Sequence, residues 1–408
     1  MRRADLRATL LAQNAGSDPG LLALKYAQMR RTSFAFFRAT CGLYYARAAA
    51  HGLLPRAPLG WLCGDLHLEN FGSYRGENGL AYFDINDFDE AVLAPGTWDI
   101  LRLTASVLVW ARERQHSAAD QRAAARIALD AFGDALRRGR ARWMERATAE
   151  GPIRKLLRQV KRRTQRRVLD ERTVWSKRAG RRRLLREPDR QLPVSRTDRR
   201  RVVRALARFA RRWHDERSYR VLDVARRVAG LGSLGLPRWV ILVEGDGSPN
   251  GNWLLDLKTA RAPAAASAAR ARQPRWRREA HRVVQVQDWL QAEPPALLAA
   301  LDLGRTGCVL RELQPQADRL RLAHLDASPD RAGSVLRAMG HLAAWALLRG
   351  AGRHGAAGVD EWMHWATPPR WGRDLLDRAG ELASGARADW LEFCGAYDDG
   401  AFGRPRDG

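Results

Sequence analysis

The chain has 408 residues, 45% of them hydrophobic, which is enough to bury a substantial core in two or three domains. Its formal net charge of +26 favours attraction to polyanions, and no apolar run approaches the ~20 residues that span a bilayer. The first residues lack the apolar region of a signal peptide, and the four cysteines are scattered without metal-ligand spacing. We therefore expect reduced thiols, no membrane contact and a cytoplasmic location.

Lysine is rare in this chain. Most of the 71 basic residues are arginine. The five lysines are Lys25, Lys155, Lys161, Lys177 and Lys258. Such arginine dominance is typical of a compositional bias, so we interpret much of the positive charge as a solvated surface rather than a nucleic-acid groove. A lysine beside a functional motif carries correspondingly more weight.

The first 150 residues are predicted to be mainly helical. Apolar residues at helical spacing predict helices over 21–51, 98–114 and 118–149. Between the first two, residues 59–90 switch to short strands separated by a turn at 76–79.

An Asp-to-Asn spacing stands out in this strand-and-turn segment. Asp65 is followed five residues later by Asn70, which is the spacing of the protein-kinase catalytic loop. In that loop the aspartate orients and deprotonates the acceptor hydroxyl, and the asparagine holds a metal ion. We predict these roles for Asp65 and Asn70, and we interpret His67 between them as a packing residue.

Three aspartates follow where kinases place their metal-binding aspartate: Asp84, Asp87 and Asp89. The run 87–89 and the later segment 94–99 resemble the aminoglycoside phosphotransferases. That resemblance selects Asp87 as the principal magnesium ligand, with Asp89 or Asp84 as a second contact. Carboxylates this close repel each other and need a cation to stay ionised together. Asp99 is expected to be a structural cap.

Residues 151–218 form the most arginine-rich part of the chain. Apolar residues there keep a helical period, which predicts a basic helical insert with a charged exposed face rather than a disordered tail. This face is the candidate surface for weak polyanion binding.

Strand patterns dominate residues 219–318. A hairpin signal at 246–251 joins two apolar strands, and a loop of the form G-x-G-x-x-G precedes it. A dinucleotide-binding loop must open a helix, whereas this loop opens a strand, as the glycine loop of kinases does. The predicted phosphate contacts of the loop are Gly230, Gly232, Ser233 and Gly235.

Lys258 ends the strand that follows the hairpin. Kinases use a lysine at such a position to hold the α- and β-phosphates of ATP, and its rarity here strengthens the assignment. The segment around Glu312 is expected to serve as the adenine-binding hinge. Residues 319–408 return to helical patterns.

These motifs together resemble an uncharacterised bacterial family known as domain of unknown function 2252. The resemblance covers most of the chain, including segments 64–72, 83–90, 223–228 and 282–287. It implies a kinase-like site and names no substrate. Gln285 departs from the family, which has a glutamate there that could pair with the lysine.

The motif order is the reverse of that in kinases, because the catalytic loop precedes the glycine loop by about 140 residues. The sequence therefore predicts an α+β, protein-kinase-like fold of two lobes, circularly permuted. Its predicted parts are a large-lobe part with the catalytic and metal loops (1–150), the basic helical insert (151–218), a small lobe of antiparallel sheet (219–318) and C-terminal helices completing the large lobe (319–408).

The leading hypothesis is an ATP- and Mg²⁺-dependent phosphotransferase with an unidentified hydroxyl acceptor. Its residues group by role as catalytic Asp65 and Lys258, metal-binding Asn70, Asp87 and Asp89, and nucleotide-binding Lys258, Glu312 and the glycine loop. Nucleotidyl transfer uses the same parts if the nucleotide binds reversed. Two non-enzymatic alternatives are a nucleotide-binding pseudokinase, which Gln285 favours, and a basic protein that binds nucleic acid or an acidic partner on a kinase-like scaffold.

Overall fold

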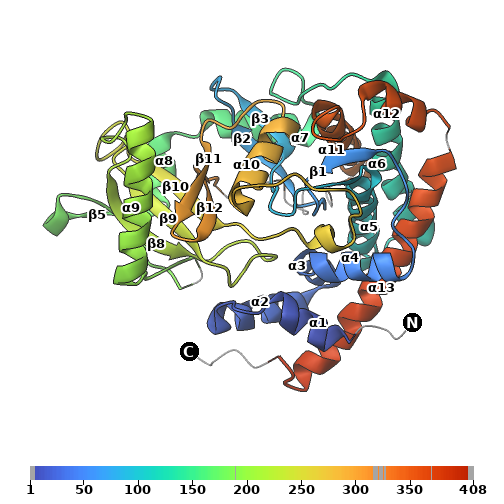
Figure 1. The fold of residues 1–408 in the computed structure, drawn as a ribbon, viewed down its shortest axis with the longest axis horizontal. Coiled ribbons are helices and arrows are strands. Elements are labelled where there is room, and N and C mark those ends of the chain that lie inside the picture. The colour runs from blue at the N-terminus through green and yellow to red at the C-terminus, as the bar shows by residue number, and fades with distance from the viewer. Residues whose placement is uncertain are drawn as a thin grey trace.

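Helices form one body of the molecule and an antiparallel sheet dominates the other, at the right and left of Figure 1. The computed structural model describes residues 5–188, 190–315, 320, 325, 328–368 and 370–402. The fold is thus α+β, as expected. Among the described helices, none combines the length and apolarity that crossing a bilayer requires.

Helix α5 (Thr97–Glu113) lies at the centre of the helical body, because its residues are buried on every side from Thr97 to Ala111. A Cβ at Gly340 would collide with the backbone of Ala128, so α6 and α11 approach closely there. The helices around α5 come from both ends of the chain: α1 (Leu6–Gln13), α2 (Pro19–Arg31), α3 (Ser33–Ala39), α4 (Cys41–Ala50), α6 (Ala118–Arg138), α11 (Pro329–Gly350), α12 (Val359–Ala366) and α13 (Arg370–Asp398).

Two of the predicted helices end earlier than expected. The helix predicted over 21–51 is three helices, and Thr32 separates the first two by accepting a hydrogen bond from the amide of Ala35 (3.0 Å). The helix predicted over 118–149 ends at Gly139, whose φ of +61° gives the left-handed conformation of a C-terminal cap.

The second body is built on one six-stranded antiparallel sheet. The predicted hairpin at 246–251 joins β9 and β10, and Val202, Leu206 and Phe209 of α9 (Arg196–Arg212) belong to the apolar cluster on one face of the sheet. In spatial order the strands are β11 (Leu298–Leu303), β12 (Thr306–Glu312), β10 (Trp253–Thr259), β9 (Arg238–Val243), β8 (Val221–Arg227) and β7 (Gln191–Leu192).

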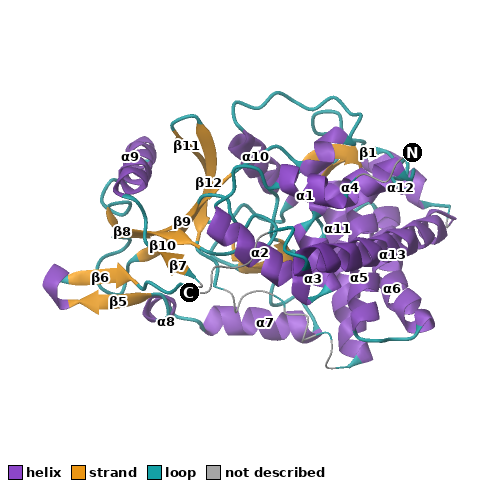
Figure 2. Cartoon of the chain, turned by 90° about the horizontal axis from the view of Figure 1, so that it is seen from below, coloured by secondary structure: helices purple, strands orange, loops and turns teal. Residues whose placement is uncertain are grey.

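The segment predicted as a basic helical insert, 151–218, contains three helices and also three short strands. It contains α7 (Gly151–Arg162), α8 (Gln165–Asp170) and α9, but also the hairpin of β5 (Thr173–Ser176) and β6 (Arg181–Leu184) and the edge strand β7. Figure 2 shows this hairpin and α9 on opposite sides of the main sheet. Arginine-rich strands such as β6 carry little strand signal, and tertiary pairing decides their conformation.

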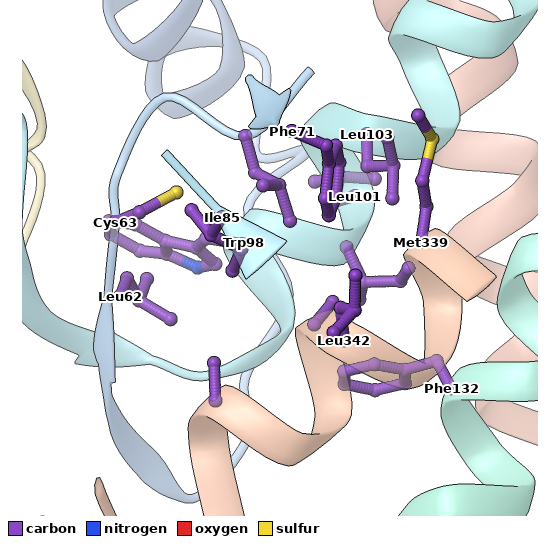
Figure 3. Packing of buried hydrophobic residues seen from close by; sticks show 14 of the residues in the cluster. Leu62, Cys63, Phe71, Ile85, Trp98, Leu101, Leu103, Phe132, Met339 and Leu342 are labelled. Carbon is purple, nitrogen blue, oxygen red and sulfur yellow. The ribbon is translucent and has the colours of Figure 1, made fainter. Parts of the chain in front are cut away.

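Two short ladders position the acidic loops of the helical body. β1 (Leu59–Leu62) pairs with β4 (Val92–Pro95), and β2 (Phe71–Arg75) pairs with β3 (Ala81–Ile85). This nesting places the β1–β2 loop (63–70) beside the β3–β4 loop (86–91). Buried residues of both ladders pack against α5 and α11, as Figure 3 shows for Leu62, Phe71, Ile85, Leu101 and Leu342.

Candidate functional site

The loop predicted to be catalytic (63–70, the catalytic loop) and the loop predicted to bind metal (86–91, the metal loop) touch through their backbones. Gly64 has a φ of +83°, and a Cβ there would collide with the carbonyl oxygen of Glu90. The carboxylate of Asp99 at the start of α5 accepts hydrogen bonds from the amides of Cys63 (2.8 Å) and Gly64 (3.0 Å). Asp99 thus acts as a structural cap of the catalytic loop.

Asp65 faces the cavity with its charge balanced by a buried arginine. Arg102 of α5 donates from Nε to Asp65 Oδ1 (2.6 Å) and from Nη2 to the carbonyl of Phe37 (3.1 Å). Burial raises the pKa of the Asp65 carboxyl, and Arg102 opposes that rise. His67 is buried with Nε2 4.0 Å from Asp65 Oδ2, which agrees with a packing role.

The amide of Asn70 is oriented by the same loop. Its Nδ2 donates to the backbone carbonyl of Asp65 (2.6 Å), which leaves its Oδ1 available as a ligand. Asn70 also lines the cavity that contains Asp65.

The three aspartates of the predicted metal segment separate into two classes. Asp87 and Asp89 line the cavity. Asp84 is buried in the wall behind them, where its carboxylate accepts from Arg349 (2.9 Å) and from the amide of Ala292 (3.2 Å). Asp84 is therefore a scaffold residue, and Asp89 remains the candidate for the predicted second metal contact.

A cavity of about 290 Å³ lies between the acidic loops and the sheet body. Of the predicted phosphate contacts, Gly230, Gly232 and Ser233 line it. Gly235 does not, and its carbonyl accepts a hydrogen bond from the amide of Asp18 (3.1 Å). The cavity brings together Asp65, Asn70, Asp87, Asp89, Lys258 and most of the glycine loop.

Lys258 crosses this cavity from the sheet to the metal loop. Its Nζ forms an ion pair with Asp89 and lies 3.7 Å from Asp87 Oδ2, and its side chain is only 6% exposed. Its carboxylate partners therefore come from the metal loop rather than from the position of Gln285 on α10 (Glu279–Leu290).

Glu312 lies apart from the other predicted residues. It is exposed at the end of β12 and lines a second cavity of about 110 Å³, together with Asn86 and Gln314. Arg311 lines both cavities and so marks the wall between them. The predicted hinge is thus adjacent to the main cavity rather than inside it.

Four strands of the sheet carry a charge cluster that was not predicted from the sequence. Asp256 pairs with Arg227 (2.9 Å), Arg238 (2.5 Å) and Arg311 (3.3 Å). Burial alone would raise the pKa of Asp256, but the three guanidinium groups hold it well below its usual range. An aspartate inside an otherwise apolar strand was the available signal, and the abundance of arginine concealed its partners.

Arg282 of α10 was also missed, although it lies in a segment that carries the family resemblance. Its guanidinium donates to the carbonyls of Asp89 (2.8 Å), Ala91 (2.5 Å) and Arg261 (2.8 Å). It therefore fastens the metal loop to α10 and to the chain that follows Lys258.

The residues at hand suit magnesium better than zinc. No group of three His, Cys, Asp or Glu side chains that could hold a metal occurs within the described part of the chain. The candidate ligands in the cavity are the carboxylates of Asp87 and Asp89 and the amide oxygen of Asn70. Mg²⁺ commonly binds through one or two carboxylates and completes its shell with water and phosphate oxygens, so this set fits.

Comparison with known protein families gives a match over most of the chain. A family model described as an uncharacterized protein conserved in bacteria (DUF2252) matches residues 17–396, which include both loops, the glycine loop and Lys258. No curated protein and no solved structure matches the chain.

Proposed function

The chain belongs to this bacterial family, DUF2252, and we propose that it is an ATP- and magnesium-dependent phosphotransferase that acts on a hydroxyl group. One observation carries the proposal. Asp65, Asn70 and Asp87 line the same cavity as the glycine loop and Lys258, although about 140 residues of chain separate the two sets. Phosphoryl transfer depends mainly on positioning and charge stabilisation, which such a cavity supplies.

Asp65 is the proposed base. Its carboxylate takes the proton of the acceptor hydroxyl while the acceptor oxygen forms a bond to the γ-phosphorus and the bond to ADP breaks. Arg102 holds one carboxylate oxygen, so it orients the group and keeps it ionised. The Asp65 side chain lines the cavity, where the acceptor would bind.

Lys258 and the glycine loop are the proposed phosphate contacts. The loop joins β8 to β9, and the lysine lies on β10, so three consecutive strands supply them, as expected for a kinase small lobe. Asn70, Asp87 and Asp89 would hold Mg²⁺, which when bound neutralises phosphate charge. Asp89 forms an ion pair with Lys258, which the uncharged Gln285 cannot form.

Calorimetry of ATP binding with and without Mg²⁺ tests the metal assignment. The Asp87→Ala variant should lose magnesium-dependent ATP binding, because it removes one of two carboxylate ligands. Asp130→Ala, which removes an exposed carboxylate of α6, is the matched control. Unchanged magnesium dependence in Asp87→Ala would refute the assignment.

The same protein distinguishes the chemical alternatives by its products. We expect slow release of ADP from Mg·ATP with water as acceptor, reduced at least about 100-fold in Asp65→Asn, which keeps the shape but loses the base. Release of pyrophosphate instead of ADP would indicate nucleotidyl transfer. Tight Mg·ATP binding without either product would indicate a pseudokinase.

A further inference from the structure

The two buried lysines of the described chain line one cavity. Lys25 is 4% exposed and Lys258 5% exposed, whereas the other three lysines are exposed. Both buried lysines line the cavity of the acidic loops. In a chain that otherwise uses arginine, two compact ammonium groups in one cavity point to a common kind of ligand.

Lys25 comes from outside both predicted motifs. It lies on α2, and its Nζ donates to Asn14 Oδ1 (2.8 Å) and to the carbonyl of Gly232 in the glycine loop (2.8 Å). Asn14 is fixed in this orientation because its Nδ2 donates to the carbonyl of Leu10 (2.8 Å). Both acceptors are neutral, so two of the three ammonium hydrogens are used without balancing the charge.

The other cations that face the cavity are paired with carboxylates. Lys258 pairs with Asp89, Arg38 with Glu69, and Arg238 and Arg311 with Asp256. Lys25 and Arg261 form no ion pair with any described carboxylate. A buried charge without a counter-ion is costly, and a second cation nearby adds to that cost.

The electrostatics of Lys25 agree with this imbalance. Burial and the charge of Arg261 lower the pKa of Lys25 to about 8, against the opposing influence of Glu90 and Asp65. An anion next to Lys25 would remove both penalties.

We propose that Lys25 and Arg261 bind a phosphate group beside the glycine loop. The N-terminal helices thereby contribute a cation to a site otherwise built from the sheet and the two acidic loops. The phosphate belongs either to the nucleotide or to the acceptor, and only that distinction rests on the proposed function.

Calorimetric titration of the full chain with sodium tripolyphosphate, in EDTA and without nucleotide, tests the anion site. Lys25→Met and Arg261→Met should each weaken binding about 10-fold to 100-fold, the range expected when a hydrogen bond to a charged group is lost. Lys155→Met removes an exposed lysine of α7 and should bind as the wild type does, at the same salt concentration. Lys25→Arg, which keeps the charge, should bind more tightly than Lys25→Met.

Thermal melting separates anion binding from a structural role of Lys25. Lys25→Met removes a buried unbalanced charge, so without anion it should melt no lower than the wild type, and it should lose the rise in melting temperature that tripolyphosphate causes. A lower melting temperature together with unchanged tripolyphosphate affinity would make Lys25 a tether of the glycine loop and overturn the proposal. Arg261 is exposed, so Arg261→Met should fold as the wild type does. Unchanged affinity of this variant for tripolyphosphate would overturn the proposed role of Arg261.

A final titration assigns the phosphate to its source. If a saturating non-hydrolysable ATP analogue with Mg²⁺ excludes inorganic phosphate, and Lys25→Met weakens the analogue, the phosphate is the nucleotide's. If inorganic phosphate still binds the nucleotide-filled protein, and Lys25→Met prevents this, the acceptor is an anionic hydroxyl compound. If neither tripolyphosphate nor inorganic phosphate binds the wild-type protein, the proposed anion site is refuted. Absence of ATP turnover alone would refute only the proposed phosphotransferase activity.

Discussion

Individual buried charges in this protein are held by several partners each. Asp256 is 1% exposed and contacts three arginines, and the fully buried Arg102 contacts both a carboxylate and a backbone carbonyl. Burying an ion is costly, and only several charge-assisted contacts offset that cost. These residues therefore belong to the framework that holds the cavity walls in place.

Asp256→Ala should lower the free energy of unfolding by about 3–5 kcal/mol at neutral pH, since it leaves two buried guanidinium groups and one partly buried one without their carboxylate. The folded pKa of Asp256 is depressed, so its stabilisation is complete above the unfolded pKa of about 3.9 and decreases progressively as pH falls from there towards the folded pKa. Urea unfolding from pH 7 down to pH 3 would show the wild type and the variant converging. An equal difference at both ends would contradict this, and Asp130→Ala controls for loss of one surface charge.

At the residue scale, the part of the site that local spacing encodes could be predicted. Asp65, Asn70 and Asp87 were predicted from short motifs, and Lys258 from its place after the hairpin. Lys25 gave no such signal, because nothing near it in sequence resembles a phosphate site. Its contact with Gly232 joins residues 207 positions apart, and only tertiary packing creates it.

At the element scale, helix α10 controls the metal loop through one side chain. Arg282 reaches three carbonyls, and its ion pair with Glu279 one turn earlier fixes the guanidinium (2.7 Å). Apolar residues at helical spacing over 279–292 predict this helix, which spans Glu279–Leu290 in the structure. Its link to the metal loop could not be predicted, because backbone carbonyls carry no sequence signal.

Arg282→Met should weaken Mg·ATP binding about 10-fold, because the metal loop loses its attachment to α10. Arg282→Lys should not restore it, since one ammonium lacks the planar fork that reaches several acceptors. Calorimetry well below the melting temperature measures the effect, with Arg337→Met on the exposed face of α11 as control. Wild-type affinity in both Arg282 variants would show that the loop holds its shape unaided.

The secondary structure was predicted wrongly where local backbone conformation or strand pairing, rather than the spacing of apolar residues, determines it. The helix from 118 stops at Gly139 because a left-handed residue ends it, although apolar residues continue beyond. Strands β5 and β6 escaped prediction because their residues are mostly polar and basic, so pairing rather than composition determines them.

At the scale of the whole molecule, positive charge is concentrated on the sheet body. Helix α9 carries eight arginines and one aspartate, and all eight arginines are exposed, although Arg201 and Arg208 also donate to backbone carbonyls of β11. Such a face attracts polyanions without a built recognition site.

We therefore expect weak binding of duplex DNA without sequence preference, which falls steeply between about 50 and 200 mM salt. Replacing Arg200, Arg204 and Arg208 by glutamine should reduce both the affinity and the slope against salt. Fluorescence anisotropy with two unrelated duplexes measures this. Tight binding that persists at high salt, or that prefers one duplex, would instead indicate a dedicated nucleic-acid function.

The separation of the two halves of the cavity along the chain affects how the protein is made. Asp87 leaves the ribosome about 170 residues before Lys258, a delay of roughly 10–30 s at usual rates of synthesis. Helix α5, which is buried on every side in the finished protein, must also wait for α11 and α13. A nascent chain thus carries the acidic loops without the sheet body, and α5 without its covering helices, during this interval. We expect α5 to keep an uncovered apolar surface until α11 and α13 have been synthesised, and this surface is a binding site for chaperones that act on nascent chains.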